Sequence, residues 1–193
     1  MKQFKVQEAI ERIQKAYDRF GNEMFLGHSG GKDSQVILHL TKQVTDDFII
    51  VHNVKPLYYD NMNEVEALTA MYPETLEFLY SEIAGKQAVE FMPATMMEEF
   101  LIEADLHCQI DGARIVEGER AGKSANIIRD GENVSRSEMT DFEEKGIFDL
   151  SICYPIYDWA DEDVFDYLMA NDILISDEYV NNGELDAYYN SKQ

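Results

Sequence analysis

Cysteine and long apolar runs are both scarce in this chain. Its 193 residues contain 2 cysteines, Cys108 and Cys153, which are too few for a disulfide framework or a thiolate metal site. No stretch reaches the roughly 20 consecutive apolar residues that a membrane-spanning helix requires. The N-terminus begins with polar residues and lacks the apolar core of a secretion signal. We therefore expect a soluble, cytoplasmic protein without a membrane partner.

Basic residues are also few. The chain has 16 lysines and arginines against 38 aspartates and glutamates, a net charge of −22. This acidic protein repels the phosphate backbone of nucleic acids, so direct nucleic-acid binding is not expected. The charge is uneven, because residues 114–136 hold five basic and four acidic side chains. Two interpretations of that window stay open: a local anion site, or chance variation on a solvated surface.

What the chain has in quantity is apolar sequence suited to one folded domain. Apolar residues make up 45% and aromatic residues 11% of the composition, outside the range typical of disordered chains. The length favours a single domain over residues 1–193. Residues 6–20 carry apolar side chains at the spacing of one helix face. The tail from about residue 181 is polar and is expected to be loose.

Strands and helices are predicted to alternate along the chain. The β-branched, apolar run at residues 48–54 is typical of a strand buried on both faces of a parallel sheet. Short apolar runs predict strands at residues 24–27, 88–92 and 114–117, and an extended segment at 152–157. Helical periodicities predict helices from about residue 34 and over 63–71, 74–84, 95–107 and 161–169. In the last of these helices, Val164, Phe165, Leu168 and Met169 are expected to point inward. This order predicts an α/β fold with a single doubly wound, mostly parallel sheet and helices on both faces.

The segment Ser29-Gly30-Gly31-Lys32-Asp33-Ser34 joins the first predicted strand to the helix after it. Glycines let the backbone approach a ligand closely, and the first N–H groups of a helix attract anions. Lys32 adds a positive charge, and the two serines add hydroxyl donors. The common phosphate-binding loop is excluded, because it requires glycine where Leu26 stands and a hydroxyl where Asp33 stands. The segment therefore predicts a phosphate site of another nucleotide-binding fold.

Ser-Gly-Gly-Lys-Asp-Ser after a buried strand resembles the PP-loop of adenine nucleotide alpha hydrolases, enzymes that cleave ATP between its α and β phosphates. Three later segments are similar to the phosphoadenosine phosphosulfate (PAPS) reductase-like family, which includes sulfate adenylyltransferase small subunits and DNA phosphorothioation proteins. Residues 72–78 resemble a Pro-Glu-Thr helix start. Residues 118–124 resemble a Gly-x-Arg-x-x-Glu-Ser segment of the nucleotide cleft. Residues 154–164 resemble Pro-Ile-x-Asp-Trp-Thr-x-x-Asp-Val. The resemblance runs from about residue 24 to residue 169.

The sequence departs from the family pattern at several positions. Lys123 stands where the family has glutamate, Ile127 where an arginine often follows, and Ala160 where a hydroxyl residue would cap a helix. Trp159, in the third segment, is either a core anchor or a ligand contact. The family's reductases carry a catalytic cysteine near the C-terminus in a Glu-Cys-Gly-x-His context, whereas no cysteine follows Cys153 here. The missing cysteine counts against sulfur reduction and leaves nucleotide binding as the expectation.

The resemblance implies a set of site residues. The candidate contacts of the nucleotide are Ser29, Gly30, Gly31, Lys32, Asp33, Ser34, Asn53, Gly118, Arg120, Lys123 and Ser124. The candidate catalytic residues are Lys32, Asp33 and Arg120. Asp33 either orients Mg²⁺, as a weak candidate ligand, or only stabilises the start of the helix. His28, beside the turn, either contacts phosphate or packs against it.

Three functions follow from the resemblance, with ATP or PAPS and Mg²⁺ as the expected cofactors. The first is cleavage of ATP at the α–β phosphoanhydride, in pyrophosphatase or adenylyltransfer chemistry that needs no protein nucleophile. The second is reduction of PAPS or adenosine phosphosulfate, or another sulfur transfer, for which Cys153 would have to be reactive, although a buried structural cysteine is the better interpretation. The third is noncatalytic nucleotide binding, by sequestration or through a protein partner. A partner protein that supplies the missing acceptor site is a further expectation. An oligomer is compatible with all three.

Overall fold

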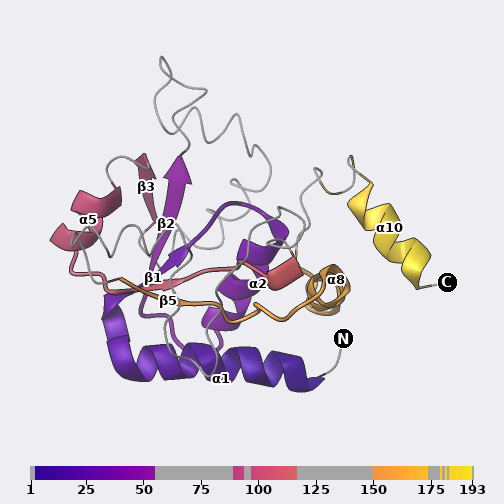
Figure 1. The fold of residues 1–193 in the computed structure, drawn as a ribbon, viewed down its shortest axis with the longest axis horizontal. Helices are drawn as coiled ribbons and strands as arrows, with labels where there is room; N and C mark the ends of the chain where they lie inside the picture. Colours follow the sequence, from indigo (N-terminus) through magenta and orange to yellow (C-terminus); the bar gives the residue numbers. More distant parts are fainter. Residues whose placement is uncertain are drawn as a thin grey trace, which may run out of the picture.

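One parallel sheet of five strands organises the part of the chain that the structure describes (Figure 1). The structure is a computed structural model, and it describes residues 3–54, 89–93, 97–116, 150–173, 179, 181 and 183–192. The strands lie in the order β3-β2-β1-β4-β5, and each strand runs parallel to its neighbours. They are β1 (Met24–Gly27), β2 (Ile49–Val54), β3 (Val89–Pro93), β4 (Cys108–Ile110) and β5 (Ser151–Cys153).

Helices cover both faces of the sheet, because the strands carry apolar side chains on both. Met24 and Leu26 of β1 point into a core that is completed by α1 (Gln3–Phe20), α2 (Lys32–Thr41) and α8 (Asp161–Ala170). Phe25, between them in the sequence, belongs to the opposite core, where it packs with β2 and with α5 (Met97–Glu103). The predicted α/β fold with a doubly wound parallel sheet is therefore confirmed.

Helix α1 forms where its amphipathic pattern predicts it. It begins at Gln3, three residues before the predicted start, and ends at Phe20. Ala9, Ile13 and Ala16, at helical spacing, are all buried in the core. A short 3-10 turn, η1 (Gly21–Glu23), leads from the helix directly into β1. The helix runs along the lower side of the sheet in Figure 1.

Two predicted elements differ from the structure. The strand predicted at residues 114–117 is wrong, because β4 lies six residues earlier and Ile115 and Val116 are helical. A strand of three residues is too short to leave a clear alternation in the sequence. The helix predicted over residues 95–107 ends at Glu103, because Asp105 adopts a left-handed backbone with a φ of 55°.

Helix α8 matches its prediction with one exception. Val164 and Leu168 are buried as expected, but 44% of the surface of Met169 is exposed. Tyr167 takes the inward position, because residues three and four apart lie on one helix face and Tyr167 follows Val164 by three. Ala160, at the start of the helix, cannot cap it with a side chain, and its backbone N–H donates to the Asp163 carboxylate at 3.0 Å.

The C-terminal tail contains a helix, α10 (Glu184–Ser191), where the sequence predicted loose chain. It packs against α8. The ring of Tyr188 lies 5.3 Å from the ring of Phe165, and its hydroxyl donates to the Asp166 carboxylate at 2.7 Å. Lys192 pairs with the same carboxylate at 2.8 Å. Because these partners lie about twenty or more positions apart in the sequence, local periodicity does not indicate them.

The remaining predictions fall on parts that the structure leaves undescribed. The helices predicted over residues 63–71 and 74–84 lie outside the described residues. Among the described residues, no helix is long and apolar enough to cross a membrane. A single domain over residues 1–193 stays a prediction.

Truncating the side chain of Ile110 should destabilise the fold. Ile110 is fully buried in β4 within the core shared by α1, α2 and α8, so Ile110→Ala should leave a cavity and lower the free energy of unfolding by about 2–5 kcal/mol. Ile102→Ala, on the exposed side of α5 with 48% of its surface accessible, should change it by less than about 0.5 kcal/mol. Urea unfolding measures both values, and equal losses would contradict the packing described.

Acid should weaken the docking of α10 on α8. Burial raises the pKa of Asp166, but hydrogen bonds to its carboxylate, first among them the one from Lys192, lower the pKa to about 2, from an ordinary value of 3.8. A carboxyl group with a depressed pKa stabilises the fold above its unfolded pKa, and this stability is lost as the pH falls from about 4 to about 2.

The measurement for Asp166 is the free energy of unfolding of the native chain and of Asp166→Asn at pH 6 and at pH 3. The difference between the two proteins should shrink at pH 3. Asp186→Asn, which changes an exposed carboxylate on α10, should show no such shrinkage. A difference for Asp166→Asn that is constant with pH would show that the carboxylate has no part in holding α10.

Candidate functional site

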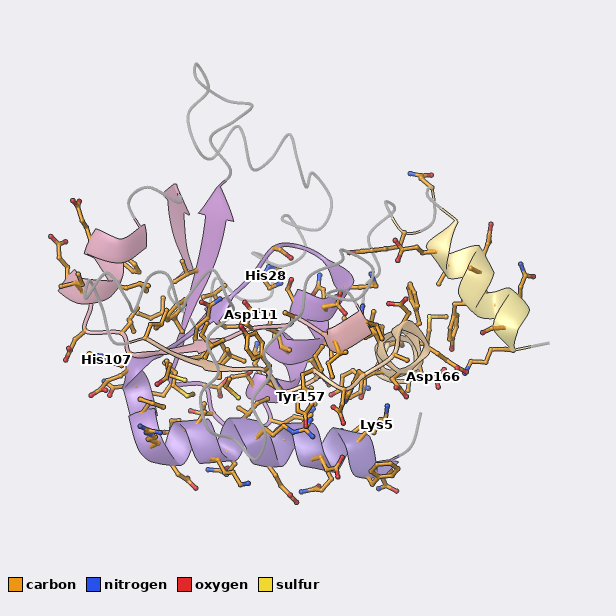
Figure 2. The ribbon with its side chains drawn as sticks, viewed as in Figure 1. Lys5, His28, His107, Asp111, Tyr157 and Asp166 are labelled. Atoms are coloured by element: carbon orange, nitrogen blue, oxygen red, sulfur yellow. The ribbon has the colours of Figure 1, made fainter. Side chains whose placement is uncertain are left out.

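The turn from Ser29 to Ser34 lies where the strand order of the sheet reverses. From β1 the sheet extends through β2 to β3 on one side and through β4 to β5 on the other. His28 follows β1 and Asp111 follows β4 (Figure 2). The register pairs Leu26 with Ile110 just before them. In open α/β sheets, ligands bind at this switch point, beyond the carboxyl ends of the strands. The fold therefore puts the turn where a ligand site is expected.

The backbone N–H groups of the turn are engaged by side-chain acceptors. Four successive residues each donate one hydrogen bond, at 3.1 to 3.3 Å. Ser29 N donates to Ser34 Oγ, Gly30 N to His28 Nδ1, Gly31 N to Ser29 Oγ, and Lys32 N to the Tyr179 hydroxyl. The turn is therefore shaped as a row of donors, and an anion that binds there exchanges with these acceptors.

The two glycines of the turn are needed for different reasons. Gly30 has a φ of +80°, in the left-handed region that side chains other than glycine rarely adopt. Gly31 allows close approach, because a Cβ atom there would lie 2.9 Å from the Tyr179 hydroxyl and 3.3 Å from Ser29 Oγ. An oxygen atom of another molecule has the same access to the bare backbone of Gly31 once Tyr179 is displaced.

Lys32 brings a buried ammonium group to the turn. The residue is 7% exposed, and its Nζ lies 3.1 Å from the Glu184 carboxylate, 3.8 Å from that of Asp33 and 4.5 Å from the centre of the Tyr179 ring. Burial lowers the pKa of Lys32, but the charges of Asp33, Tyr179 and Glu184 outweigh it and raise the pKa above its usual value. The side chain is therefore a fixed positive charge beside the row of N–H donors.

Asp33, the next residue, is bound to Arg114. Its Oδ1 lies 2.7 Å from Arg114 Nε, and Arg114 Nη2 donates to Oδ2 at 3.4 Å. Arg114 is 1% exposed, and it also contacts Asp161 at 2.8 Å and the carbonyl oxygen of Trp159 at 3.3 Å. One guanidinium group therefore joins the start of α2, the loop after β4 and the start of α8.

The loop after β4 comes this close to the turn because Gly112 has no side chain. A Cβ atom at Gly112 would lie 3.2 Å from the carbonyl carbon and oxygen of Asp33, which are backbone atoms and cannot swing aside. Asp111, beside it, accepts a hydrogen bond from the N–H of Ala113 at 2.8 Å and so shapes the loop. The conformation of this loop determines the position of the Arg114 backbone, and therefore which carboxylates its side chain reaches.

The sequence itself marks Arg114, six residues before the arginine of the segment predicted to line the nucleotide cleft. The Gly-x-Arg-x-x-Glu-Ser pattern was assigned to residues 118–124, where Lys123 replaces the glutamate. Six residues earlier, Gly112-Ala113-Arg114-Ile115-Val116-Glu117 matches its first six positions, and Gly118 stands in place of the serine. The earlier match follows β4 directly and puts its arginine against the turn. The misplaced strand at residues 114–117 concealed it, because a strand there leaves no loop for the pattern.

Several predicted site residues cannot be compared with the structure. Gly118, Arg120, Lys123 and Ser124 lie outside the described residues. Asn53 lies in β2, in register with Met92 of β3, which places its backbone one strand away from the turn. Of the predicted residues, the structure therefore brings together those from Ser29 to Ser34.

Tyr179 and Glu184 are site residues that the sequence analysis did not find. Tyr179 is 147 positions from Lys32, its hydrogen-bond partner. Both residues belong to a polar, acidic tail in which neither spacing nor composition marks them. Only the packing of the tail on α8 brings them to the turn, so no sequence signal was available for them.

Trp159 and the two cysteines are core residues. Trp159 is fully buried, with its ring 5.6 Å from that of Tyr167. Burial raises the pKa of Cys108 to about 12, and burial together with the neighbouring Cys108 raises that of Cys153. Both thiols stay protonated near neutral pH, which removes the thiolate that nucleophilic sulfur chemistry needs. Over the described ranges, no group of three His, Cys, Asp or Glu side chains is arranged to hold a metal ion.

Comparison with known proteins supports the nucleotide-binding fold. The family described as the phosphoadenosine phosphosulfate reductase domain matches residues 23–181. No curated protein matches the chain. The solved U34-tRNA thiolase NcsA from Methanococcus maripaludis, with its 4Fe-4S cluster, is similar in fold at a TM-score of 0.55 and 11% identity, over 90% of this chain and 66% of that one. The chain thus spans just under two thirds of that structure's length.

A second solved structure gives a weaker likeness. It is the NH3-dependent NAD synthetase from Campylobacter jejuni in complex with a nitrate ion, at a TM-score of 0.48 and 12% identity. The alignment covers 95% of this chain and 78% of the synthetase chain. The family match over residues 23–181 and the five-stranded parallel sheet agree on the fold.

Replacing Arg114 by lysine should destabilise the protein although the charge is kept. A lysine cannot reach both Asp33 and Asp161 as the planar guanidinium does, and loss of the hydrogen bonds to Asp33, the more buried of the two carboxylates, costs about 1–3 kcal/mol. Arg19→Lys, on the exposed side of α1, should change the free energy of unfolding by less than about 0.5 kcal/mol. Denaturant unfolding compares them, and a negligible effect of Arg114→Lys would mean that the bridge does not stabilise the junction.

Proposed function

The chain belongs to the phosphoadenosine phosphosulfate reductase domain family, and from that premise we propose that it binds an adenine nucleotide by its phosphates at the turn from Ser29 to Ser34. The observation that carries the proposal is the combination of a buried, charged Lys32 with four successive backbone N–H donors at the switch point of the sheet. Donors and a fixed positive charge in one turn are the chemistry that recognises a phosphate chain.

Binding would proceed by exchange of hydrogen-bond acceptors. Phosphate oxygens take the place of the side-chain oxygens that now accept from the turn, while the left-handed Gly30 keeps the N–H groups directed to one side. Lys32 neutralises the charge of the phosphates that bind beside it. A phosphate oxygen accepts a stronger hydrogen bond than a neutral hydroxyl does, so the exchange favours the nucleotide.

The reaction that suits this site is displacement at the α-phosphorus of ATP. A nucleophilic atom of the acceptor forms a bond to the α-phosphorus, the bond to the oxygen that bridges the α and β phosphates breaks, and pyrophosphate leaves with the electron pair. Lys32 and the N–H groups stabilise the charge that develops on pyrophosphate. We assign the same role to Arg120, on the strength of the family resemblance. No residue of the chain has to act as nucleophile.

The residues around Asp33 do not favour it as a ligand of Mg²⁺. Both of its carboxylate oxygens face cations, with Oδ1 beside Arg114 Nε and Oδ2 within 3.8 Å of Lys32 Nζ. We therefore assign Asp33 to the stabilisation of the start of α2 through Arg114. Mg²⁺ in protein sites is commonly held in large part by the phosphates of the nucleotide and by water, and any such ion would arrive with ATP.

Two other functions of the family remain to be weighed against this one. Reduction of a sulfonucleotide requires an exposed thiolate, and both cysteines of these 193 residues are buried with raised pKa values. Noncatalytic binding beside a protein partner requires only the turn, so it shares the binding step of the proposal. The two binding functions differ in whether pyrophosphate is released.

Lys32→Met should weaken the binding of ATP by about tenfold or more, because a hydrogen bond to a charged group contributes about 1.5–3 kcal/mol. Lys42→Met, which removes a lysine at the opposite end of α2, is the matched control and should leave the affinity within about twofold. Titration calorimetry with ATP and Mg²⁺ measures both dissociation constants. Equal affinities for the two variants would remove Lys32 from the site.

The same titrations with AMP and PAPS separate the family's substrates, and an assay of pyrophosphate release with candidate acceptors tests the chemistry. ATP should bind more tightly than AMP, which lacks the two phosphates assigned to the turn. A tenfold preference for PAPS over ATP, about 1.4 kcal/mol, would assign the site to a sulfonucleotide. ATP binding without pyrophosphate release for any acceptor would favour the noncatalytic function.

A further inference from the structure

Two side chains from the C-terminal part of the chain lie on the turn. The hydroxyl of Tyr179 accepts the hydrogen bond of Lys32 N at 3.1 Å, and its oxygen is the atom that a Cβ at Gly31 would meet at 2.9 Å. The carboxylate of Glu184 lies 3.1 Å from Lys32 Nζ. Two of the groups that the proposed function gives to phosphate, a backbone N–H and the ammonium, are therefore already engaged by this chain.

The chemistry of these two side chains imitates that of a phosphate. Glu184 supplies an anionic oxygen to the ammonium, and Tyr179 supplies an oxygen acceptor to the N–H donor. The ring of Tyr179 also covers Lys32 Nζ, at 4.5 Å from the ring centre, where a cation and an aromatic face attract each other. Because each contact uses a group that a nucleotide needs, the side chains and the phosphate cannot occupy the turn together.

The contact is held in place by the packing of the tail on α8. The rings of Tyr179 and Tyr188 both contact Phe165, at 6.4 and 5.3 Å between ring centres. Lys192, at the far end of α10, pairs with Glu162 and Asp166 of α8. Gly183, immediately before Glu184, has a φ of +80°, a conformation that glycine adopts at little cost. Helix α10 is therefore held on α8 by residues away from the turn, while its first residue, Glu184, contacts the turn.

We propose that Tyr179 and Glu184 form a cover over the phosphate turn, an autoinhibitory contact that a nucleotide must displace in order to bind. The inference rests on the proposed function, because it assigns to the same turn a competitor from within the chain. An internal competitor lowers the apparent affinity in proportion to the fraction of molecules in which the site is open. The cover thereby raises the ligand concentration that is needed to fill the site. Release of α10 from α8 lowers that concentration again.

The first test is the affinity of the full chain for inorganic pyrophosphate, measured by calorimetry. Glu184→Gln removes the anionic competitor and should tighten binding by about two- to fivefold, the range expected from a partly exposed ion pair. Tyr179→Phe frees the N–H of Lys32 while keeping the ring, and should act in the same direction. Asp186→Asn removes the same charge from an exposed position two residues along α10 and should leave the affinity unchanged.

A second measurement needs no ligand. The rate at which an amine-reactive reagent labels Lys32, followed by peptide mapping, reports how well the side chain is covered. Glu184 contributes to the raised pKa of Lys32, so its removal leaves more of the amine unprotonated as well as more accessible. Labelling of Lys32 should be about two- to fivefold faster in Glu184→Gln than in the native chain, and Asp186→Asn should match the native rate.

The outcomes separate the cover from the proposed function. If the native chain binds ATP or pyrophosphate and neither Glu184→Gln nor Tyr179→Phe binds pyrophosphate more tightly, the cover is wrong and the function stands. If pyrophosphate binds in the expected order and ATP does not bind at all, the cover stands and the function fails. If no variant binds either ligand, both are wrong, because an uncovered turn has to accept an anion.

Discussion

The guanidinium of Arg114 is buried between two carboxylates from the first turns of two different helices. Asp33 is the second residue of α2 and Asp161 the first of α8, and both reach the same side chain within 2.8 Å. A buried cation is tolerated only with such partners, because an unpaired one would cost several kcal/mol of desolvation. The turn from Ser29 to Ser34 is tied to this arrangement, because its last three residues form the first turn of α2. Asp161 ties the start of α8 to the same guanidinium, and the tail docks on α8.

The loop after β4 accommodates this junction through a glycine. A Cβ atom at Gly112 would meet the backbone of Asp33, whereas one at Gly27 would meet the movable end of the Gln109 side chain. Because Gly112 has no side chain, the loop after β4 can pass close to α2. A larger residue at Gly112 would push the loop of Arg114 away from the carboxylate that it has to reach. Backbone proximity and charge pairing are thus two parts of one constraint.

The sequence allowed the frame of the site to be predicted, because local rules govern it. Glycines, a lysine and serines after a buried strand have few uses other than an anion site, and the alternation of strands and helices indicates the parallel sheet around it. The parts that were missed depend on tertiary contact. The three-residue β4 left no alternation, so the loop carrying Arg114 was read as a strand. Met169 was assigned inward, but Tyr167 holds that position and bonds to His39 across the helices at 2.8 Å.

The C-terminal tail contains the site residues that are hardest to predict from the sequence. Nothing local distinguishes Tyr179 or Glu184 from their polar neighbours, and their importance comes from partners about 150 positions earlier in the chain. Contacts of this span depend on the docking of α10, which in turn depends on the face that α8 presents. A prediction from sequence would have needed the fold first, and then the orientation of each helix.

The burial of Lys32 has a kinetic consequence in a chain of this charge. With a net charge of −22, the protein repels a nucleotide, itself an anion, at long range, and the binding proposed at Lys32 supplies attraction only close to the ammonium. Salt screens charges over about 10 Å at 0.1 M and affects a buried contact much less. Added salt should therefore remove more of the distant repulsion than of the local attraction. Arrival of the nucleotide should quicken as ionic strength rises, opposite to the behaviour of proteins that steer anions toward a basic surface.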